Sequence, residues 1–363
     1  MIKKFIVKVY DEAGDFVIAI PESVLMSPIR FSSKINGGQG ELVLDLNLHW
    51  DDPPSYASVQ NYVRVYQVDT TNTTGRLIYS GKITQIEPSL SEKGSKISLV
   101  CLGLGSLLQN ELYNAAHVAV DPAVIIAAII TDNQTDYPAS FGDGWIGSDA
   151  IAGVRTGGQV DTVSTTVTFE FINTYWRDAV RKTIELTGGS WYWFIDAGGD
   201  FIFKEKPASA DHVFTVGKDI DSISAPNSIE DIVNFVTVKY DGGTVTANDA
   251  TSISNYGKRG KYQDETSGTS TVATAQNIAD QVIAENKDPK KTVEIVLNDN
   301  YDLETIKVGE TCKVQNLKKD STVVSDNMQI VSINYDNGQF VALGLEKLTD
   351  YGTELESFID SKV

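Results

Sequence analysis

The sequence predicts a β-rich α+β fold, with two small β-barrel or β-sandwich domains and a smaller α+β domain between them. Apolar residues alternate with polar ones in short stretches that end at turn residues, both in the first third of the chain and after Asp211. Helical periodicity is confined to a few separate stretches. The composition, 41% hydrophobic and 22% charged over 363 residues, is typical of a globular chain with a large core.

Residues 1–105 are expected to form the first β domain, with about seven strands. The clearest strand is Leu42 to Leu48, in which every second residue is leucine and the residues between include Asp45. Further strands are predicted at 5–9, 16–20, 62–68, 77–86 and 96–102. Short strands joined by tight turns favour a small barrel or a sandwich.

Residues 106–206 are expected to form the α+β domain. Asp121 and Pro122 begin a helix near 122–131, and Asn173 or Thr174 caps a second helix that ends near 187. A hairpin over 190–204 follows, with its tip at a Gly-Gly pair. Residues 132–168, rich in Gly, Asp, Ser and Thr, predict a long loop or an insertion with weak strands.

Residues 207–345 are expected to form the second β domain, which includes a helix over 271–287. Ser270 or Thr271 offers the N-cap. One face of this helix is predicted to be apolar and consists of Val272, Ala275, Ile278, Ala279, Val282 and Ile283. Asp288-Pro289 ends this helix. The remaining residues, 346–363, form an acidic tail for which a short helix and disorder are both open.

The charge and the cysteines exclude several classes of protein. A net charge of −19 disfavours binding to nucleic acid phosphates or to an anionic membrane surface. No apolar run approaches ~18 residues, so no membrane span is expected, and the N-terminus lacks the apolar segment of a signal peptide. Cys101 and Cys312 lie in separate apolar stretches, which predicts buried free thiols.

No catalytic, cofactor or metal site is predicted. The three histidines, His49, His117 and His212, are far apart in sequence. Asp299, Asn300 and Asp302 loosely resemble a calcium loop, but the glycine and the terminal Glu of an EF-hand are missing, so a turn is favoured. The sequence contains no serine-hydrolase elbow and no zinc-protease motif.

Two groups of residues are candidates for binding. Trp191 and Trp193 belong to an aromatic stretch that is apolar on both faces; a buried strand is favoured over a ligand-stacking platform. Lys258, Arg259 and Lys261 form a basic group, NYGKRGKY, in an acidic chain. A solvated loop and an electrostatic contact with an acidic neighbouring protein are both open.

Several segments resemble phage tail hub proteins, a family related to the hub part of type VI secretion spikes. NYVRVYQ, LIYSGKITQIEPSL and GSKISLVCLGLGSLL resemble the first domain of these hubs. RKTIELTGGSWYWFIDAGGDFIFKEKP resembles the helix-hairpin of the second. DIVNFVTVKY, ATAQNIADQVIAENKDPKKTVEIVLND and IKVGETCKV complete a likeness that covers most of residues 1–345, although 132–168 fit no part of it.

The resemblance implies a non-enzymatic structural protein of the virion, made in the host cytoplasm and located at the tail tip or baseplate. It implies a homotrimer whose two tube-type β domains per chain form a pseudo-hexameric ring on the hexameric tail tube, as part of the conduit for DNA ejection. The implied partners are the tail tube protein, the distal tail protein, a spike or tip protein and the tape measure protein. Larger relatives carry a lytic or needle domain, which this sequence does not show, so any lytic role is expected to belong to another chain.

Two other functions are weighed against this one. The first is a carbohydrate-binding adhesin of a phage tail that uses Trp191 and Trp193, and the second is a cell-wall-degrading enzyme with an unrecognised site.

Overall fold

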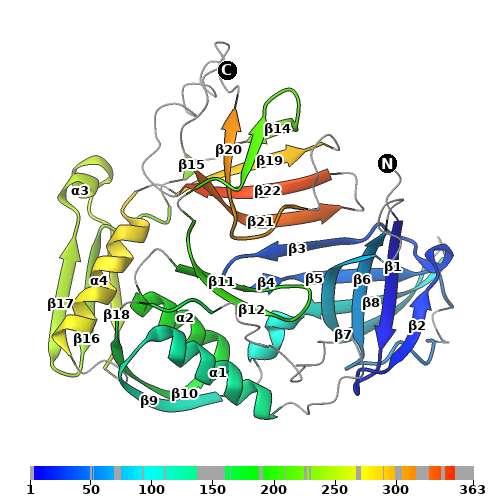
Figure 1. Cartoon of the computed structure of the whole chain (residues 1–363), viewed down its shortest axis with the longest axis horizontal. Coiled ribbons are helices and arrows are strands. Elements are labelled where there is room, and N and C mark those ends of the chain that lie inside the picture. Colours follow the sequence, from blue (N-terminus) through cyan, green and yellow to red (C-terminus); the bar gives the residue numbers. More distant parts are fainter. Residues whose placement is uncertain are drawn as a thin grey trace.

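The computed structural model describes residues 4–49, 51, 53–68, 75–91, 94–109, 112–136, 160–163, 165–187, 191–207, 209–224, 227–228, 230–266, 271–288, 290–298, 305–315, 327–336 and 340–347. These residues form a six-stranded, a nine-stranded and a three-stranded sheet together with two strand pairs (Figure 1). The predicted β-rich α+β class is confirmed. The predicted turn at 299–302 and almost all of the acidic tail lie outside the described residues, as do 137–159 of the expected insertion.

The first large sheet is antiparallel and has the order β2-β1-β6-β7-β8-β5. Its strands are β1 (Lys4–Tyr10), β2 (Phe16–Ile20), β5 (Glu41–Leu46), β6 (Tyr62–Val68), β7 (Arg76–Ser91) and β8 (Gly94–Gly103). Leu42, Leu44 and Leu46 are fully buried on its inner face, as their alternation predicts. Two 3₁₀ turns, η1 (Glu22–Val24) and η2 (Leu104–Gln109), flank the sheet.

The second large sheet joins segments from both ends of the chain. Its strands are β3 (Arg30–Lys34), β4 (Gly38–Gln39), β13 (His212–Thr215), β14 (Ile220–Ser224), β15 (Asn227–Ser228), β19 (Lys290–Leu297), β20 (Thr311–Gln315), β21 (Met328–Asp336) and β22 (Phe340–Lys347).

The strand β3 departs from the predicted organisation, because it leaves the N-terminal region and pairs antiparallel with β21. The Arg30 Nε donates to Asp336 Oδ1 at 2.8 Å, and the rings of Phe31 and Tyr335 stack with centroids 4.6 Å apart. The nine-stranded sheet is therefore not confined to the expected segment 207–345. Of the strands in residues 1–105, β3 and β4 belong to it, and the other six form the six-stranded sheet.

The α+β region contains α1 (Pro122–Asp136), α2 (Trp176–Thr187) and a strand pair, β9 (Leu112–Val120) and β10 (Val167–Tyr175). The pair was not predicted. Residues 173–175 end β10 rather than begin the helix, so α2 starts at Trp176, three residues after Asn173. Asn173 has φ 48°, an uncommon conformation for a residue other than glycine, just before the chain turns from strand to helix.

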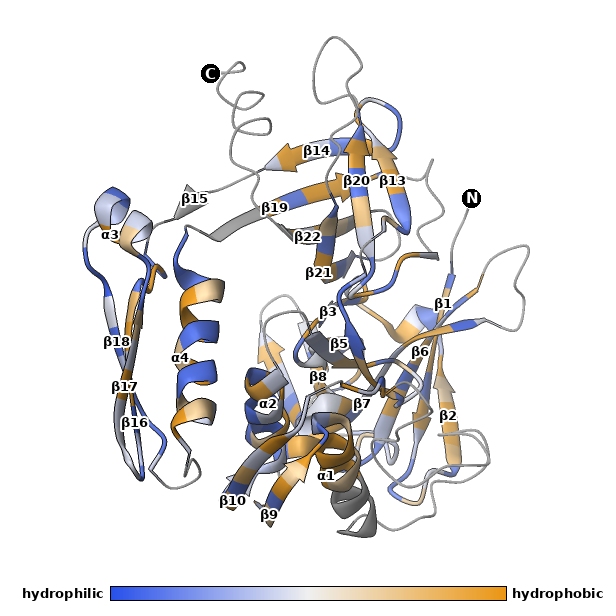
Figure 2. Ribbon diagram, turned by 60° about the vertical axis from the view of Figure 1, so that its left-hand side comes forward, coloured by the Kyte–Doolittle hydropathy of each residue, from blue (hydrophilic) through white to orange (hydrophobic). Residues whose placement is uncertain are grey.

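The third sheet consists of β16 (Phe235–Tyr240), β17 (Gly243–Asn248) and β18 (Gly260–Asp264), with β16 in the centre. The short helix α3 (Ala250–Tyr256) precedes β18, and the long helix α4 (Val272–Asn286) follows it. We call residues 232–287 the three-stranded module. The predicted helix 271–287 thus covers a separate small sheet, and the segment 207–345 divides between two sheets (Figures 1 and 2).

A hairpin, β11 (Trp191–Ile195) and β12 (Phe201–Glu205), lies between the large sheets and α2 (Figure 1). Trp193 and Ile195 pack into the core formed with the helices, whereas Tyr192 and Phe194 pack into the core of the nine-stranded sheet. Because both faces of β11 are buried, this hairpin connects two hydrophobic cores.

Candidate functional site

The three-stranded module carries the basic residues that the sequence singled out. Its inner face is apolar and packs against α4: Val236, Val238, Val245 and Ala247 are buried together with Ile278 on the helix. The strand β18 pairs with β16 in parallel and forms one edge of the sheet. Alternation along β18 then sends neighbouring side chains to opposite faces.

The basic residues Lys258, Arg259 and Lys261 do not form one cluster. The Lys258 Nζ lies 3.6 Å from the centroid of the Phe235 ring, a cation–π contact. Lys261 is exposed and pairs with Val236, the neighbour of Phe235, so it points toward the opposite face of the sheet. The two lysines therefore offer charge on different faces of one edge.

Arg259 is held mainly through its backbone. Its N–H donates to Asn234 Oδ1 at 2.7 Å, and its carbonyl accepts from the N–H groups of Asn234 and Phe235. Asn234 is fully buried and also donates to the carbonyl of Gly257 at 2.8 Å. These bonds fix the path of the basic loop without using the charges of its side chains.

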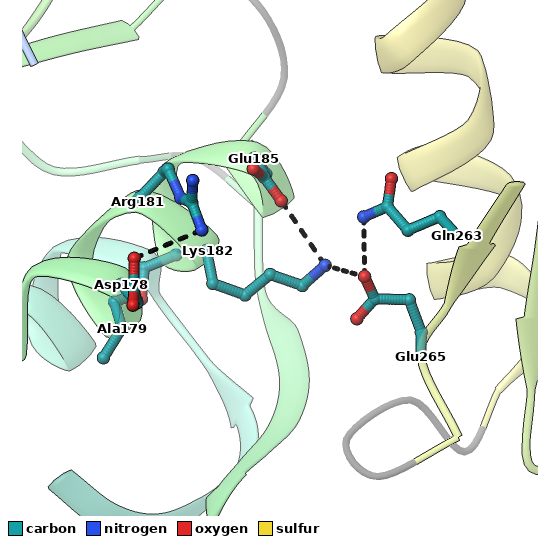
Figure 3. A network of polar contacts seen from close by, with 8 residues as sticks. Asp178, Ala179, Arg181, Lys182, Glu185, Gln263 and Glu265 are labelled. Atoms are coloured by element: carbon teal, nitrogen blue, oxygen red, sulfur yellow. Dashed lines mark hydrogen bonds and ion pairs between the residues drawn. The ribbon is translucent and has the colours of Figure 1, made fainter. Parts of the chain in front are cut away.

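A buried ionic contact joins the module to α2. The Lys182 Nζ lies 2.6 Å from Glu265 Oε1 and 3.4 Å from Glu185 Oε2 (Figure 3). The Lys182 and Glu265 side chains are only 13% and 12% exposed. The Gln263 Nε2 donates a further hydrogen bond to Glu265 Oε1 at 2.6 Å.

The contact between Lys182 and Glu265 is not evident from the sequence. The pairing of Lys182 with Glu185, three residues apart, is detectable as a helix-surface pair, but Glu265 lies far along the chain. Helix periodicity carries no information about such a distant partner.

The aromatic hairpin residues are packed against other rings. Trp193 is 1% exposed and stacks on Phe201 with centroids 5.3 Å apart. Trp191 is half-buried and stacks on Phe203 at 4.7 Å. A sugar could therefore not reach the Trp193 ring in this structure, which disfavours the ligand platform.

Two carboxylates on sheet strands, Asp45 on β5 and Glu294 on β19, lie in different environments. Burial raises the pKa of the Asp45 carboxyl, but hydrogen bonds from Ser98 at 2.5 Å and Lys96 at 3.1 Å outweigh it and hold the pKa below its usual value. Glu294 is exposed on β19. Asp45 is thus tied into the six-stranded sheet, while Glu294 is free to face a solvent-filled space.

The remaining candidate groups show no convergence on a chemical site. The histidines contact three separate partners: His49 with Asp51, His117 with Tyr113, and His212 with Glu310. Cys101 and Cys312 are free and fully buried, as expected, and burial raises the pKa of both thiols. Within the described ranges, His, Cys, Asp and Glu nowhere gather in a group of three or more suited to a metal ion.

Among the described helices, none has the length and apolar character needed to cross a membrane.

Comparisons with known proteins place the fold. No protein-family model and no curated protein matches the sequence. The solved structures that match nearly the whole chain include three tail proteins. A tail protein from Neisseria meningitidis MC58 is 10% identical, with a TM-score of 0.62 over 95% of this chain and 96% of that one. The 43 kDa tail protein of prophage MuSo2 from Shewanella oneidensis is 12% identical, with a TM-score of 0.59 over 94% and 97%.

The third match, the prophage tail protein gp18 from Listeria monocytogenes EGD-e, is 11% identical, with a TM-score of 0.55 over 98% of each chain. The chain therefore has the fold of phage tail proteins, and the resemblance found in the sequence is confirmed at the level of the fold.

Proposed function

We propose that the chain is a non-enzymatic structural protein of a phage-type tail, and specifically a hub at the tail tip or baseplate. The main support for this proposal is that each of the three structural matches covers nearly all of this chain and nearly all of the matched chain. The whole chain, and not one domain of it, corresponds to nearly the whole of each of three tail proteins. A binding module or an enzyme built on a borrowed domain would share only part of its length.

In this role the chain acts as a homotrimer. The two large sheets of each chain supply two tube-like units, and three chains then give the pseudo-hexameric ring that fits a hexameric tail tube. Two features connect the units rigidly. The strand β3 comes from the N-terminal region and pairs with β21 of the nine-stranded sheet, and the hairpin β11–β12 packs into two hydrophobic cores. A rigid pair is what a closed ring with alternating units requires.

The partners in this proposal are the tail tube protein, the distal tail protein, a spike or tip protein and the tape measure protein. The ring forms part of the DNA conduit without binding DNA specifically. A net charge of −19 supports this part, because a wall of negative charge does not hold the phosphate backbone.

The test is the mass of the particle in solution. Light scattering coupled to gel filtration, over a series of protein concentrations, should show a species of three times the 39.6 kDa chain mass. Addition of the tail tube protein should stabilise that species. A chain that stays monomeric or dimeric even in assembled tails would overturn the proposal.

A further inference from the structure

A hollow of about 430 Å³ opens where four segments meet. Its walls come from the turn between β3 and β4, the start of β5, the junction of β8 with η2, and the first turn of α2. Arg177 and Lys34 lie on its lining, together with Ser32, Ser106 and Gln109. A volume of this size lies within the range of pockets that hold a small ligand or a few side chains.

Part of the wall is bare backbone. A Cβ at Gly105 would lie 2.4 Å from the carbonyl oxygen of Gly37, and a Cβ at Gly103 would lie 2.1 Å from that of Gln39. Only glycine allows the chains to approach this closely. The close approach packs the backbone of residues 37–39 directly against that of residues 103–105.

Two cations at the hollow have no carboxylate partner. The Arg177 Nη2 lies 3.7 Å from the position that a Cβ on Gly37 would take, so the guanidinium reaches across the β3–β4 turn. Among the described residues neither Arg177 nor Lys34 forms an ion pair, whereas Arg181, one turn further along α2, pairs with Asp178 at 3.2 Å. In a chain with 49 acidic and 30 basic residues, two cations that form no ion pair, against the single carboxylate of Glu41 on the same lining, give this hollow a local excess of positive charge.

We propose that this hollow binds an acidic peptide segment, with an Asp or Glu side chain of the partner held between Arg177 and Lys34. A guanidinium pairs with a carboxylate through two parallel hydrogen bonds, and the serine hydroxyls and Gln109 add polar contacts at the sides. Glu41 also lines the hollow, and its charge opposes a dense polyanion such as DNA. A segment with one or two separated carboxylates meets both cations without crowding Glu41.

The proposed binding of an acidic peptide does not depend on the proposed homotrimer, so either proposal can be overturned while the other holds. The probe is an N-acetylated, C-amidated peptide Gly-Asp-Gly-Asp-Gly, titrated into the full chain by calorimetry or by NMR. Its partner probe is Gly-Asn-Gly-Asn-Gly, which has the same shape without charge. We expect binding of the first, weakening as salt is raised, and no measurable binding of the second.

Three variants locate the binding. The double change Arg177→Gln with Lys34→Gln should weaken the acidic peptide at least about tenfold, because charge-assisted hydrogen bonds are lost. Gly37→Leu keeps both cations and fills the hollow, since a Cβ there meets no atom closer than 3.7 Å, and it should weaken binding as strongly. Arg181→Gln removes one charge from the same helix outside the hollow and should leave the affinity within about twofold.

The variants and probes separate binding at the hollow from general electrostatic attraction. Loss of binding in both hollow variants, with unchanged melting temperatures and an unaffected Arg181→Gln, supports the proposal. Equal weakening in Arg181→Gln shows general electrostatic attraction and overturns it. Equal binding of the amide peptide, or inorganic phosphate that competes as well as the peptide, overturns the assignment to acidic peptide, and so does the absence of binding to the wild type.

Discussion

The Lys182 ammonium group forms ion pairs with two carboxylates, Glu265 in the three-stranded module and Glu185 on its own helix. Both long side chains of the closer pair are nearly buried, so they have lost most of their contact with water. Their mutual attraction compensates for this loss only while both are present. Removal of the cation leaves two carboxylates close together without a counter-charge.

We therefore expect Lys182→Met to destabilise the attachment of the module by about 3 kcal/mol, since methionine keeps the volume and removes the charge. Urea unfolding and hydrogen exchange of the amides in β18 and α4 measure the effect. Arg181→Met is the control, because its pair with Asp178 is largely solvated and should contribute less than about 1 kcal/mol. Exchange rates in β18 that match the wild type would show that the ionic contact does not hold the module.

At the scale of elements, α4 is specified by its own sequence. Thr271 caps it by accepting a hydrogen bond from the N–H of Thr274, and Ala275, Ile278, Ala279 and Ile283 are buried on one face. The predicted face is confirmed for these four residues and wrong for Val272, which is 58% exposed in the first turn. The helix covers β16 and β17 and supplies half of the module's core.

Ile278→Asp should unfold the module. The substitution places an unpaired carboxylate at a site that is 1% exposed, at a cost of several kcal/mol. Asn277→Asp adds the same charge at the exposed neighbouring position and should have little effect. Limited proteolysis should release fragments cut within 232–287 from the first variant only, while the nine-stranded sheet stays resistant. Resistance of the module in Ile278→Asp would mean that the helix can turn this face away from the sheet.

Gly309, in the turn before β20 of the nine-stranded sheet, packs directly against Tyr192 of the hairpin β11–β12. Gly309 has φ 89°, and a Cβ there would lie 2.1 Å from Cε2 of Tyr192, whose side chain is buried. Gly94 has φ 130° but open space around its Cβ position. The two glycines thus separate the effect of backbone conformation from the effect of crowding.

Gly94→Ala should cost about 1 kcal/mol for the positive φ alone. Gly309→Ala should cost clearly more, since the ring of Tyr192 must also move out of a packed core. Thermal melting of both variants measures the difference. Equal losses would indicate that Tyr192 has room to shift, which the packing of the hairpin does not allow for.

The elements that could be predicted from the sequence are those whose determining residues lie close together along the chain. The alternating leucines of β5, the cap of α4 and the two apolar faces of β11 are local patterns, and each led to the correct element. The strands β9 and β10 were missed because outward-facing positions such as Val118 and Ile172 are also apolar, 74% and 52% exposed, so alternation is weak.

Long-range pairing could not be predicted. The strand β3 pairs with β21 near the other end of the chain, and Lys182 contacts Glu265, which lies on a distant segment.

The helix α3 was not predicted, although it has a local signal: Asp249 caps it by accepting a hydrogen bond from the N–H of Ser252. An Asp three residues before a Ser is common in turns as well, so the pattern alone does not separate the two.

At the scale of the whole molecule, the proposed hub needs opposite charges in different places. A lumen wall must not hold a polyanion, and exposed carboxylates such as Glu294 suit it. Contacts with acidic neighbouring proteins gain from cations at an edge, where Lys258 and Lys261 lie on the two faces beside β18. The fold provides positions for both uses.

The triple change Lys258→Gln, Arg259→Gln and Lys261→Gln should weaken assembly and make it less sensitive to salt. Stability of the monomer should change little. The backbone bonds of Arg259 remain, and the loss of the Lys258 contact with Phe235 costs about 0.5–1 kcal/mol. Sedimentation at low and high salt, with and without the tail tube protein, measures assembly. A control that removes equal charge at Lys206, Lys218 and Lys313 should assemble like the wild type. If the two triple variants behave alike, the basic residues at β18 contribute only to overall charge, and the contacts between subunits must lie elsewhere.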